Sequence, residues 1–151
     1  MTPEERLAEL GLAVPEVAKP LASYVPAVRS GQHVYTAGQL PLRDGELITT
    51  GKVGGDVTEE QALECARQCG LNALAAVRAE IGGLSAIKRV VKVVVFVAST
   101  PDFTGQPAVA NGASDLFGEV FGEAGRHARS AVGVAALPRD APVEVELVVE
   151  V

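Results

Sequence analysis

Residues 143–151 alternate between apolar and acidic side chains, with Val148 as the single exception. The apolar set points one way and the acidic set points the other: Val143, Val145, Leu147, Val149 and Val151 against Glu144, Glu146 and Glu150. Successive side chains of a β-strand point to opposite faces, so the pattern predicts a strand with one buried face and one polar face. The rest of the chain must supply the neighbouring strands and the elements that cover the apolar face.

Two helices are predicted to supply that cover. Thr58 and Gln61 form a capping-box signature at the start of residues 58–81, and Gly82-Gly83 ends this first helix. Its apolar residues recur at spacings of three and four: Leu63, Ala66, Gly70, Leu74, Val77 and Ile81. Residues 106–122 are predicted to form the second helix, with an apolar side at Val109, Ala113, Leu116, Phe117 and Val120.

The remaining segments complete a mixed sheet. Strands are predicted over residues 24–29 and 33–37, joined by a turn at 30–32, and then over 90–97, 129–136 and 143–151. Turns are expected at 43–46 and 137–140. This order predicts an α+β fold with two helices packed on one face of a mixed β-sheet. Residues 1–151 fit one domain, and a helix at about 2–11 is expected as an extension of it.

Charge and hydropathy exclude several classes of partner. Thirteen basic and nineteen acidic residues give a net charge of −6, and aromatic residues make up 4% of the chain. Such a chain lacks both the electrostatic attraction to phosphates and the stacking surface that nucleic-acid binding uses. The longest apolar run, residues 90–98, is interrupted by Lys92 and is too short to span a bilayer. We therefore expect no nucleic-acid partner, no membrane association and a cytoplasmic location.

Three polar patterns are better explained by structure than by chemistry. Cys65 and Cys69 lie four residues apart in a predicted helix, which favours buried helix positions over a disulfide or a zinc site. The glycine-rich residues 51–55 precede a helix and either bind an anion or form a plain loop, and the plain loop is favoured. Four acidic residues are interpreted as a helix cap and a solvated helix face rather than a carboxylate site: Asp102, Asp115, Glu119 and Glu123.

One charge remains unexplained by the pattern. Arg129 opens a strand that is otherwise built from Ala, Val and Gly, and Glu144 lies near the start of the next strand. If the turn between them places these strands side by side, the guanidinium can hold a carboxylate ligand while Glu144 orients water or moves a proton. The alternative is that Arg129 and Glu144 pair with each other or with solvent.

The residues around Arg129 resemble a known signature. The segment Arg129-Ser130-x-Val132-x-Val134-x-x-Leu137-Pro138, followed by residues 143–146, is similar to the C-terminal signature of the RidA (YjgF/YER057c/UK114) family. Residues 36–41, Thr-Ala-Gly-Gln-Leu-Pro, resemble its Ser-Gly-Gln-x-Pro segment. Tyr24 and Asn111 fall where the family has a tyrosine and an asparagine. The resemblance covers roughly residues 20–151.

This resemblance implies a chorismate-mutase-like α+β fold that assembles as a homotrimer with ligand pockets between subunits. It implies hydrolysis of small, reactive enamines and imines that carry a carboxylate, giving 2-oxo acids and ammonia without a metal or an organic cofactor. By the resemblance, Arg129 clamps the substrate carboxylate and Glu144 positions the attacking water. The pocket would be lined by Tyr24, Gly38, Gln39, Asn111 and Ala131.

Several positions depart from the family pattern. Ser114 stands where an aromatic residue is usual, Ala131 replaces a frequent cysteine, and Ala22-Ser23 precede Tyr24 in place of Gly-Pro. These changes leave the carboxylate clamp in place but alter the pocket wall. A non-catalytic trimer that binds a small carboxylate metabolite is therefore the alternative function. Endoribonuclease activity agrees poorly with the negative charge and the scarcity of aromatic residues.

Overall fold

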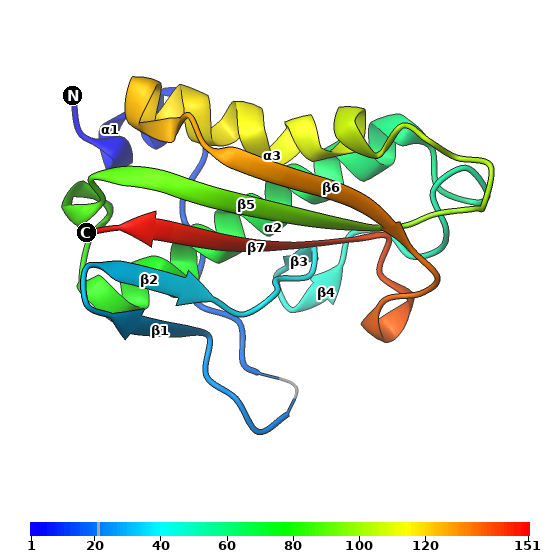
Figure 1. Cartoon of the computed structure of the whole chain (residues 1–151), viewed down its shortest axis with the longest axis horizontal. Helices are drawn as coiled ribbons and strands as arrows, with labels where there is room; N and C mark the ends of the chain where they lie inside the picture. The colour runs from blue at the N-terminus through cyan, green and yellow to red at the C-terminus, as the bar shows by residue number, and fades with distance from the viewer. Residues whose placement is uncertain (21) are drawn as a thin grey trace.

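The computed structural model describes residues 1–20 and 22–151. A mixed sheet runs through its centre (Figure 1), with the strands in the order β1-β2-β7-β5-β6. Their bounds are β1 (Ala27–Ser30), β2 (His33–Thr36), β7 (Val143–Glu150), β5 (Arg89–Ala98) and β6 (Ala128–Val134). Strands β5 and β6 run parallel, and the other neighbours run antiparallel. The expected mixed sheet is confirmed.

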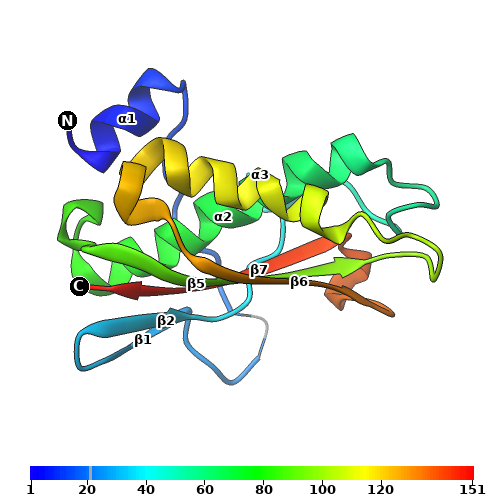
Figure 2. The same cartoon turned by 45° about the horizontal axis from the view of Figure 1, so that its top comes forward.

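The helices lie on one face of this sheet (Figure 2). Helices α2 (Glu59–Ile81) and α3 (Gln106–Phe121) cover the apolar face, as the α+β prediction required. Helix α1 (Pro3–Glu9) packs on the outer side of α3, where Leu7 is buried and the Arg6 Nη1 donates to the Val120 carbonyl at 3.3 Å. The other face of the sheet carries no helix.

Helix α2 begins and ends where its sequence signals predict. Thr58 Oγ1 accepts the Gln61 amide at 3.1 Å, and Gln61 Oε1 accepts the Thr58 amide at 2.9 Å. Gly82 ends the helix at φ 88°, a left-handed conformation that favours glycine. Leu63, predicted as part of the apolar stripe, is 40% exposed, because the buried side of α2 is centred on the residues that face β7 and α3.

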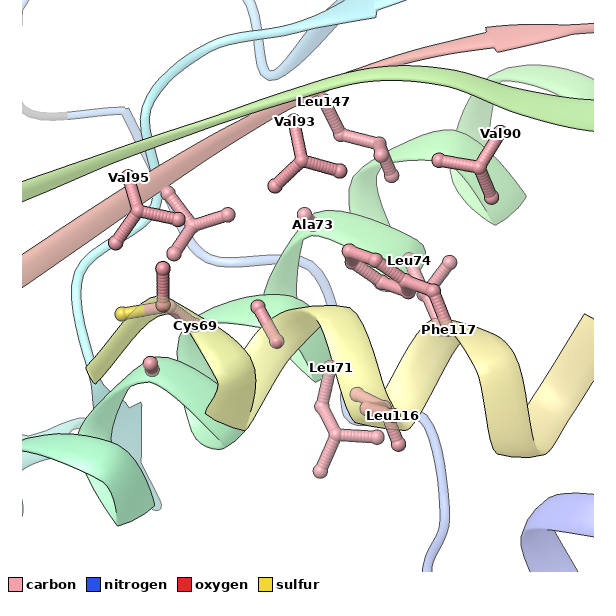
Figure 3. Packing of buried hydrophobic residues seen from close by; sticks show 14 of the residues in the cluster. Cys69, Leu71, Ala73, Leu74, Val90, Val93, Val95, Leu116, Phe117 and Leu147 are labelled. Carbon is pink, nitrogen blue, oxygen red and sulfur yellow. The ribbon is translucent and has the colours of Figure 1, made fainter. Parts of the chain in front are cut away.

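The core lies between the sheet and the two long helices (Figure 3). Phe117 of α3 and Leu74 of α2 pack together beneath Val93 of β5 and Leu147 of β7. At Gly112 a Cβ atom would overlap the Leu63 carbonyl, so this glycine allows the helices to approach closely. The apolar side predicted for α3 is confirmed, since all five of its residues are buried.

Both cysteines are buried and free in α2. Burial raises the pKa of the Cys65 thiol to about 12 and also raises the pKa of Cys69, whose Sγ lies 3.6 Å from the Val143 carbonyl oxygen. Thiols with raised pKa values are poor nucleophiles and poor metal ligands. The interpretation of Cys65 and Cys69 as structural residues is confirmed.

Several predicted boundaries were wrong by one to three residues, including those of the N-terminal helix, which spans Pro3–Glu9 rather than 2–11. Strand β1 begins at Ala27 rather than Tyr24, because Pro26 has no N–H to donate and the Tyr24 amide instead donates to the Ala22 carbonyl at 2.9 Å. Strand β6 ends at Val134, and helix α3 ends at Phe121, one residue before its C-cap Gly122.

The loops are held by their own backbone. The predicted turn at 43–46 joins two short strands, β3 (Leu42–Arg43) and β4 (Glu46–Leu47), which the sequence did not reveal. In the glycine-rich segment, the Gly54 amide donates to Val57 at 3.0 Å and the Gly55 amide donates to Lys52 at 3.0 Å. Amides that donate within the loop are not available to an anion, which favours the plain-loop interpretation.

The four acidic residues interpreted as a cap and a solvated face lie at the surface. Glu119 pairs with Arg67 at 3.3 Å, and Glu123 pairs with Arg126 at 3.6 Å. The predicted helix cap was wrong. The N-cap position of α3 is Gly105, which has no side chain to cap the helix, and Asp102 lies in the preceding turn. Within the described residues, none of the helices combines the length and apolar character needed to cross a bilayer.

Candidate functional site

The first group of predicted site residues gathers where β2 leaves β7. Regular pairing ends after Tyr35, and the Thr36 hydroxyl oxygen then accepts the Leu147 amide at 3.0 Å. The chain pairs again at Gln39, which exchanges backbone hydrogen bonds of 2.8 and 3.0 Å with Val145. The residues between these two points bulge away from β7, and Gly38 lies at the bulge.

Gly38 lies directly against the Glu144 carboxylate. A Cβ atom at Gly38 would overlap the Glu144 carboxylate oxygen Oε2, so only glycine fits while Glu144 keeps this orientation. Next to this contact is a small cavity of about 70 Å³. Its walls include Tyr24, Pro26, Gly38, Gln39, Leu40 and Glu144. We call the four predicted site residues among these, Tyr24, Gly38, Gln39 and Glu144, the Glu144 cluster.

The environment of Glu144 favours its protonated form. Burial raises the pKa of this carboxyl, and the negative charge of Glu146 raises it further. A carboxyl whose pKa lies above the usual range is better matched to proton transfer near neutral pH than an exposed glutamate. The chemistry available to this cluster is therefore acid–base chemistry on a small molecule or a water.

Buried amides of α2 hold the cavity wall that Leu40 and Leu42 form. Asn72 Nδ2 donates to the Leu40 carbonyl at 3.0 Å and to the Leu42 carbonyl at 2.9 Å. Gln68 donates to Asn72 Oδ1 at 3.1 Å and in turn accepts from Arg43 at 3.1 Å. This network was not predicted from the sequence. The pattern that indicates it is a pair of amide residues, Gln68 and Asn72, one helical turn apart on the buried side of α2.

The second group of site residues lies between β6 and α3. Arg129 Nη1 donates to Asn111 Oδ1 at 2.7 Å and to Ser114 Oγ at 3.1 Å. Ser114 Oγ also lies 2.9 Å from His127 Nε2, and His127 Nδ1 lies 2.6 Å from the Gly125 carbonyl oxygen. We call Asn111, Ser114, His127 and Arg129 the Arg129 cluster.

Arg129 forms no ion pair with any carboxylate in residues 1–20 and 22–151. Its hydrogen-bond partners in the same part of the chain are neutral oxygens. The surface ion pair considered from the sequence is thus not formed, and neither is a pair with Glu144. A half-buried guanidinium without a carboxylate partner is suited to an anionic ligand.

His127 and Ser114 complete the Arg129 cluster. Burial lowers the pKa of His127, the Gly125 carbonyl opposes this shift, and the positive charge of Arg129 lowers the pKa further. His127 was not predicted from the sequence, although it precedes Arg129 by two residues, just before β6 begins at Ala128. Ser114 follows Asn111 by three residues, which places both on one side of α3.

The two clusters do not meet within one chain. Strand β5 separates the strands that carry Arg129 and Glu144, so the prediction that these strands lie side by side was wrong. Arg129 is level with Val93 and faces the helices, whereas Glu144 is level with Phe96 and faces the open side of the sheet. The short connection between β6 and β7 crosses the end of β5, because β5 and β6 already pair in parallel.

Ala131 lies beside the Arg129 cluster rather than in it. It follows Arg129 by two residues on the helix-facing side of β6, level with Val95, and packs against the edge of the core. Asn111 contacts Arg129 directly. The structure thus brings Asn111 and Arg129 together, and separately Tyr24, Gly38, Gln39 and Glu144.

Comparison with known proteins identifies the family. Residues 4–151 match the family described as "YjgF/chorismate mutase-like, putative endoribonuclease". The chain belongs to the RidA/YjgF family. The fold class predicted from the resemblance is therefore confirmed.

Relatives within the RidA/YjgF family cover most of the chain. Protein TCP17 of Trypanosoma cruzi is 48% identical over 145 residues, which are 95% of this chain and 91% of the relative. The 2-iminobutanoate/2-iminopropanoate deaminase of Dermatophagoides farinae is 34% identical over 140 residues, 91% of this chain and 93% of the relative. Deamination of imines therefore occurs among relatives of this chain.

A solved structure of this family has the same architecture. Atu1372 of Agrobacterium tumefaciens, a protein with unknown function, superimposes with a TM-score of 0.93 at 48% identity. The match covers 99% of this chain and 92% of that one. The architecture described above is thus shared along nearly the whole chain with a solved structure.

Proposed function

We propose that this protein hydrolyses small, reactive enamines or imines that carry a carboxylate, releasing a 2-oxo acid and ammonia. The observation that carries the proposal is Arg129, a guanidinium held by Asn111 and Ser114 with no carboxylate partner in the described chain. The imine deaminase among its relatives supports the reaction class. Arg129 anchors the substrate carboxylate, and Glu144 positions the water.

The chemistry asks little of the protein. An enamine first becomes the imine by gaining a proton at its β-carbon and losing one from nitrogen. Water then adds to the carbon of the C=N bond, with one of its protons moving to the nitrogen. The C–N bond breaks as the hydroxyl proton moves to that nitrogen, so that ammonia leaves and a carbonyl remains. Because an imine is already electrophilic, orientation of the two reactants and one proton-transferring carboxyl suffice. Glu144 fits this role, because burial raises its pKa toward neutrality. No step requires a metal or an organic cofactor.

We propose further that the site forms between two copies of the chain in a homotrimer. The Glu144 cluster and the Arg129 cluster lie on opposite faces of one sheet, so a small substrate cannot touch both in a single subunit. The open face also exposes apolar side chains that a second copy would bury: Val28, Tyr35 and Val132, which are 52%, 49% and 44% exposed. The Arg129 cluster of one subunit would then complete the Glu144 cluster of its neighbour.

Ammonia release from imines generated in situ by an amino-acid oxidase tests the reaction. We expect the wild-type protein to accelerate release and Arg129→Ala to lose the acceleration by at least about a hundredfold, as the loss of an anchoring charge pair implies. Arg67→Ala is the matched control, because Arg67 is a surface arginine of α2 that pairs with Glu119, away from both clusters.

Two results would count against the proposal. Equal rates with and without the wild-type protein would exclude catalysis on this substrate class, and retained activity in Arg129→Ala would remove the anchor. If a carboxylate ligand binds while the release of ammonia is not accelerated, the protein is a binding module of the same family.

A further inference from the structure

The hydrogen bonds around His127 have a single consistent direction. The Gly125 carbonyl can only accept, so His127 Nδ1, at 2.6 Å from it, carries the proton. In the neutral imidazole, Nε2 is then an acceptor, and the Ser114 hydroxyl donates to it at 2.9 Å. The Ser114 oxygen is thereby free to accept from Arg129 Nη1 at 3.1 Å.

The neutral form of His127 is required for this direction. A protonated ring would donate from both nitrogens, and the Ser114 hydroxyl would lose its acceptor. Burial and the nearby Arg129 charge lower the pKa of His127, against the opposing effect of the Gly125 carbonyl, and so favour the neutral ring that these hydrogen bonds require. The neutral ring preserves the donor-to-acceptor order of the hydrogen bonds that link Arg129, Ser114, His127 and Gly125.

The ring itself is held firmly. Phe117 of the core meets the His127 ring edge-on, with ring centroids 5.9 Å apart and planes at 82°. The carbonyl that accepts from His127 belongs to Gly125, where a Cβ atom would overlap the Phe117 carbonyl. The chain of hydrogen bonds thus starts from a backbone turn packed against the core and ends on the guanidinium.

We propose that His127 and Ser114 are positioning residues that hold the Arg129 guanidinium in the orientation in which it receives a carboxylate. The inference rests on the proposed function for its ligand, but its structural part concerns Arg129 in the free protein. Asn111 holds Nη1 from the other side at 2.7 Å, so that two oxygens restrain one nitrogen. The other nitrogens of the guanidinium remain available to form paired hydrogen bonds with a carboxylate.

The first test measures the mobility of Arg129 without any ligand. Nitrogen-15 relaxation of the Arg129 Nε–H group should give a high order parameter in the wild type. Ser114→Ala removes the acceptor, so the order parameter should fall toward the values of mobile groups, below about 0.6. Ser114→Thr keeps the hydroxyl and should restore it. An unchanged order parameter in Ser114→Ala would overturn the proposal.

The second test measures binding of pyruvate, a small 2-oxo acid, to the assembled protein. His127→Leu and Ser114→Ala should each weaken binding about five- to tenfold, as expected for the loss of one hydrogen bond to a charged group. His127→Gln offers an amide oxygen to the Ser114 hydroxyl and should bind within about twofold of wild type. His33→Leu is the control for loss of a histidine: His33 lies on β2 and lines the same shallow surface hollow as His127, but in residues 1–20 and 22–151 it forms no hydrogen bond with Ser114 or Arg129.

The two proposals fail in different ways. If Arg129→Ala binds pyruvate as well as the wild type does, the anchor of the proposed function is wrong, whatever happens to the order parameter. If Arg129→Ala loses binding while Ser114→Ala and His127→Leu bind normally, the anchor stands and the positioning role is wrong. Equal losses in His127→Gln and His127→Leu would also contradict it, because the glutamine keeps an acceptor.

Discussion

Arg129 and Glu144 lie on opposite faces of one sheet, and strand β5 separates the strands that carry them. Two strand spacings and about three residues along the strands place their Cα atoms on the order of 14 Å apart. A substrate with only a few heavy atoms cannot span that distance. The functional unit of the proposed reaction is therefore an interface and not a single chain.

Mixing of inactive variants should restore activity. Arg129→Ala and Glu144→Ala chains should each be inactive alone, because every interface lacks one group. In randomly mixed trimers about one interface in four combines an intact Arg129 with an intact Glu144, so about a quarter of the wild-type rate should return. Refolding the two variants together and measuring ammonia release checks this. A mixture of Arg129→Ala with Arg129→Gln is the control and should stay inactive.

The Glu144 carboxyl should make stability depend on pH. Its pKa is raised in the folded protein, so the folded state keeps this proton at pH values where the unfolded chain has lost it. Stability from this group is full below the ordinary glutamate pKa and is lost as the pH rises through the raised value. Glu144→Gln should therefore raise the melting temperature at pH 8 relative to wild type, and this difference should shrink at pH 4. A constant difference across this range would contradict the assignment.

A methyl group at Gly38 should displace the Glu144 carboxylate. Gly38→Ala places a Cβ atom where the carboxylate lies. Because that carboxylate is the end of a flexible side chain, we expect it to move aside with a loss of less than about 1 kcal/mol in the free energy of unfolding, together with loss of activity. Urea denaturation measures the first quantity. Gly118→Ala is the control for stability: no atom lies within 4 Å of its Cβ position in α3, so it should be neutral or stabilise by about 0.5–1 kcal/mol. Full activity in Gly38→Ala would show that the Glu144 orientation is not needed.

Loss of the Asn72 amide should loosen the cavity wall. Asn72→Asp keeps the shape of the side chain but cannot donate to the Leu40 and Leu42 carbonyls. We expect a destabilisation of about 2–3 kcal/mol at neutral pH, because two buried carbonyls lose their partner and a charge is buried. Amide exchange in residues 39–43 should accelerate more than exchange in β5. Uniform acceleration would mean that the fold as a whole, and not this wall, had weakened.

Local signals in the sequence predicted the elements well. The Thr58–Gln61 capping box, Gly82 and the alternation in β7 each depend on neighbouring residues, and each appears where it was expected. The order of strands depends on distant contacts. The short connection after β6 suggested that β6 and β7 are neighbours, but β5, α3 and β6 form a parallel unit that leaves β7 to pair on the other side of β5.

The candidate site was predictable in its residue types but not in its grouping. The signature around Arg129 identified the charged residues, and the alternation along β7 assigned Glu144 to the polar face. Which faces carry the helices is a property of the packed structure, so the separation of the two clusters was not evident. Ser114 was noticed only as a change in the pocket wall and His127 was not predicted, because their hydrogen bonds form only when β6 lies against α3.

Strand β5 carries none of the proposed site residues, yet its pairing with β6 and β7 sets the relative positions of Arg129 and Glu144 along the sheet. Val93 sets the level of Arg129 on one side, and Phe96 sets the level of Glu144 on the other. The offset between the two charges is thus encoded in the spacing of two apolar residues. One residue inserted between Val93 and Phe96 would change this offset by one residue and would turn the residues of β5 after the insertion to the opposite face of the sheet. The sequences around Arg129 and Glu144 would stay the same. Selection on the chemistry therefore extends to the length of a strand that carries none of the proposed site residues.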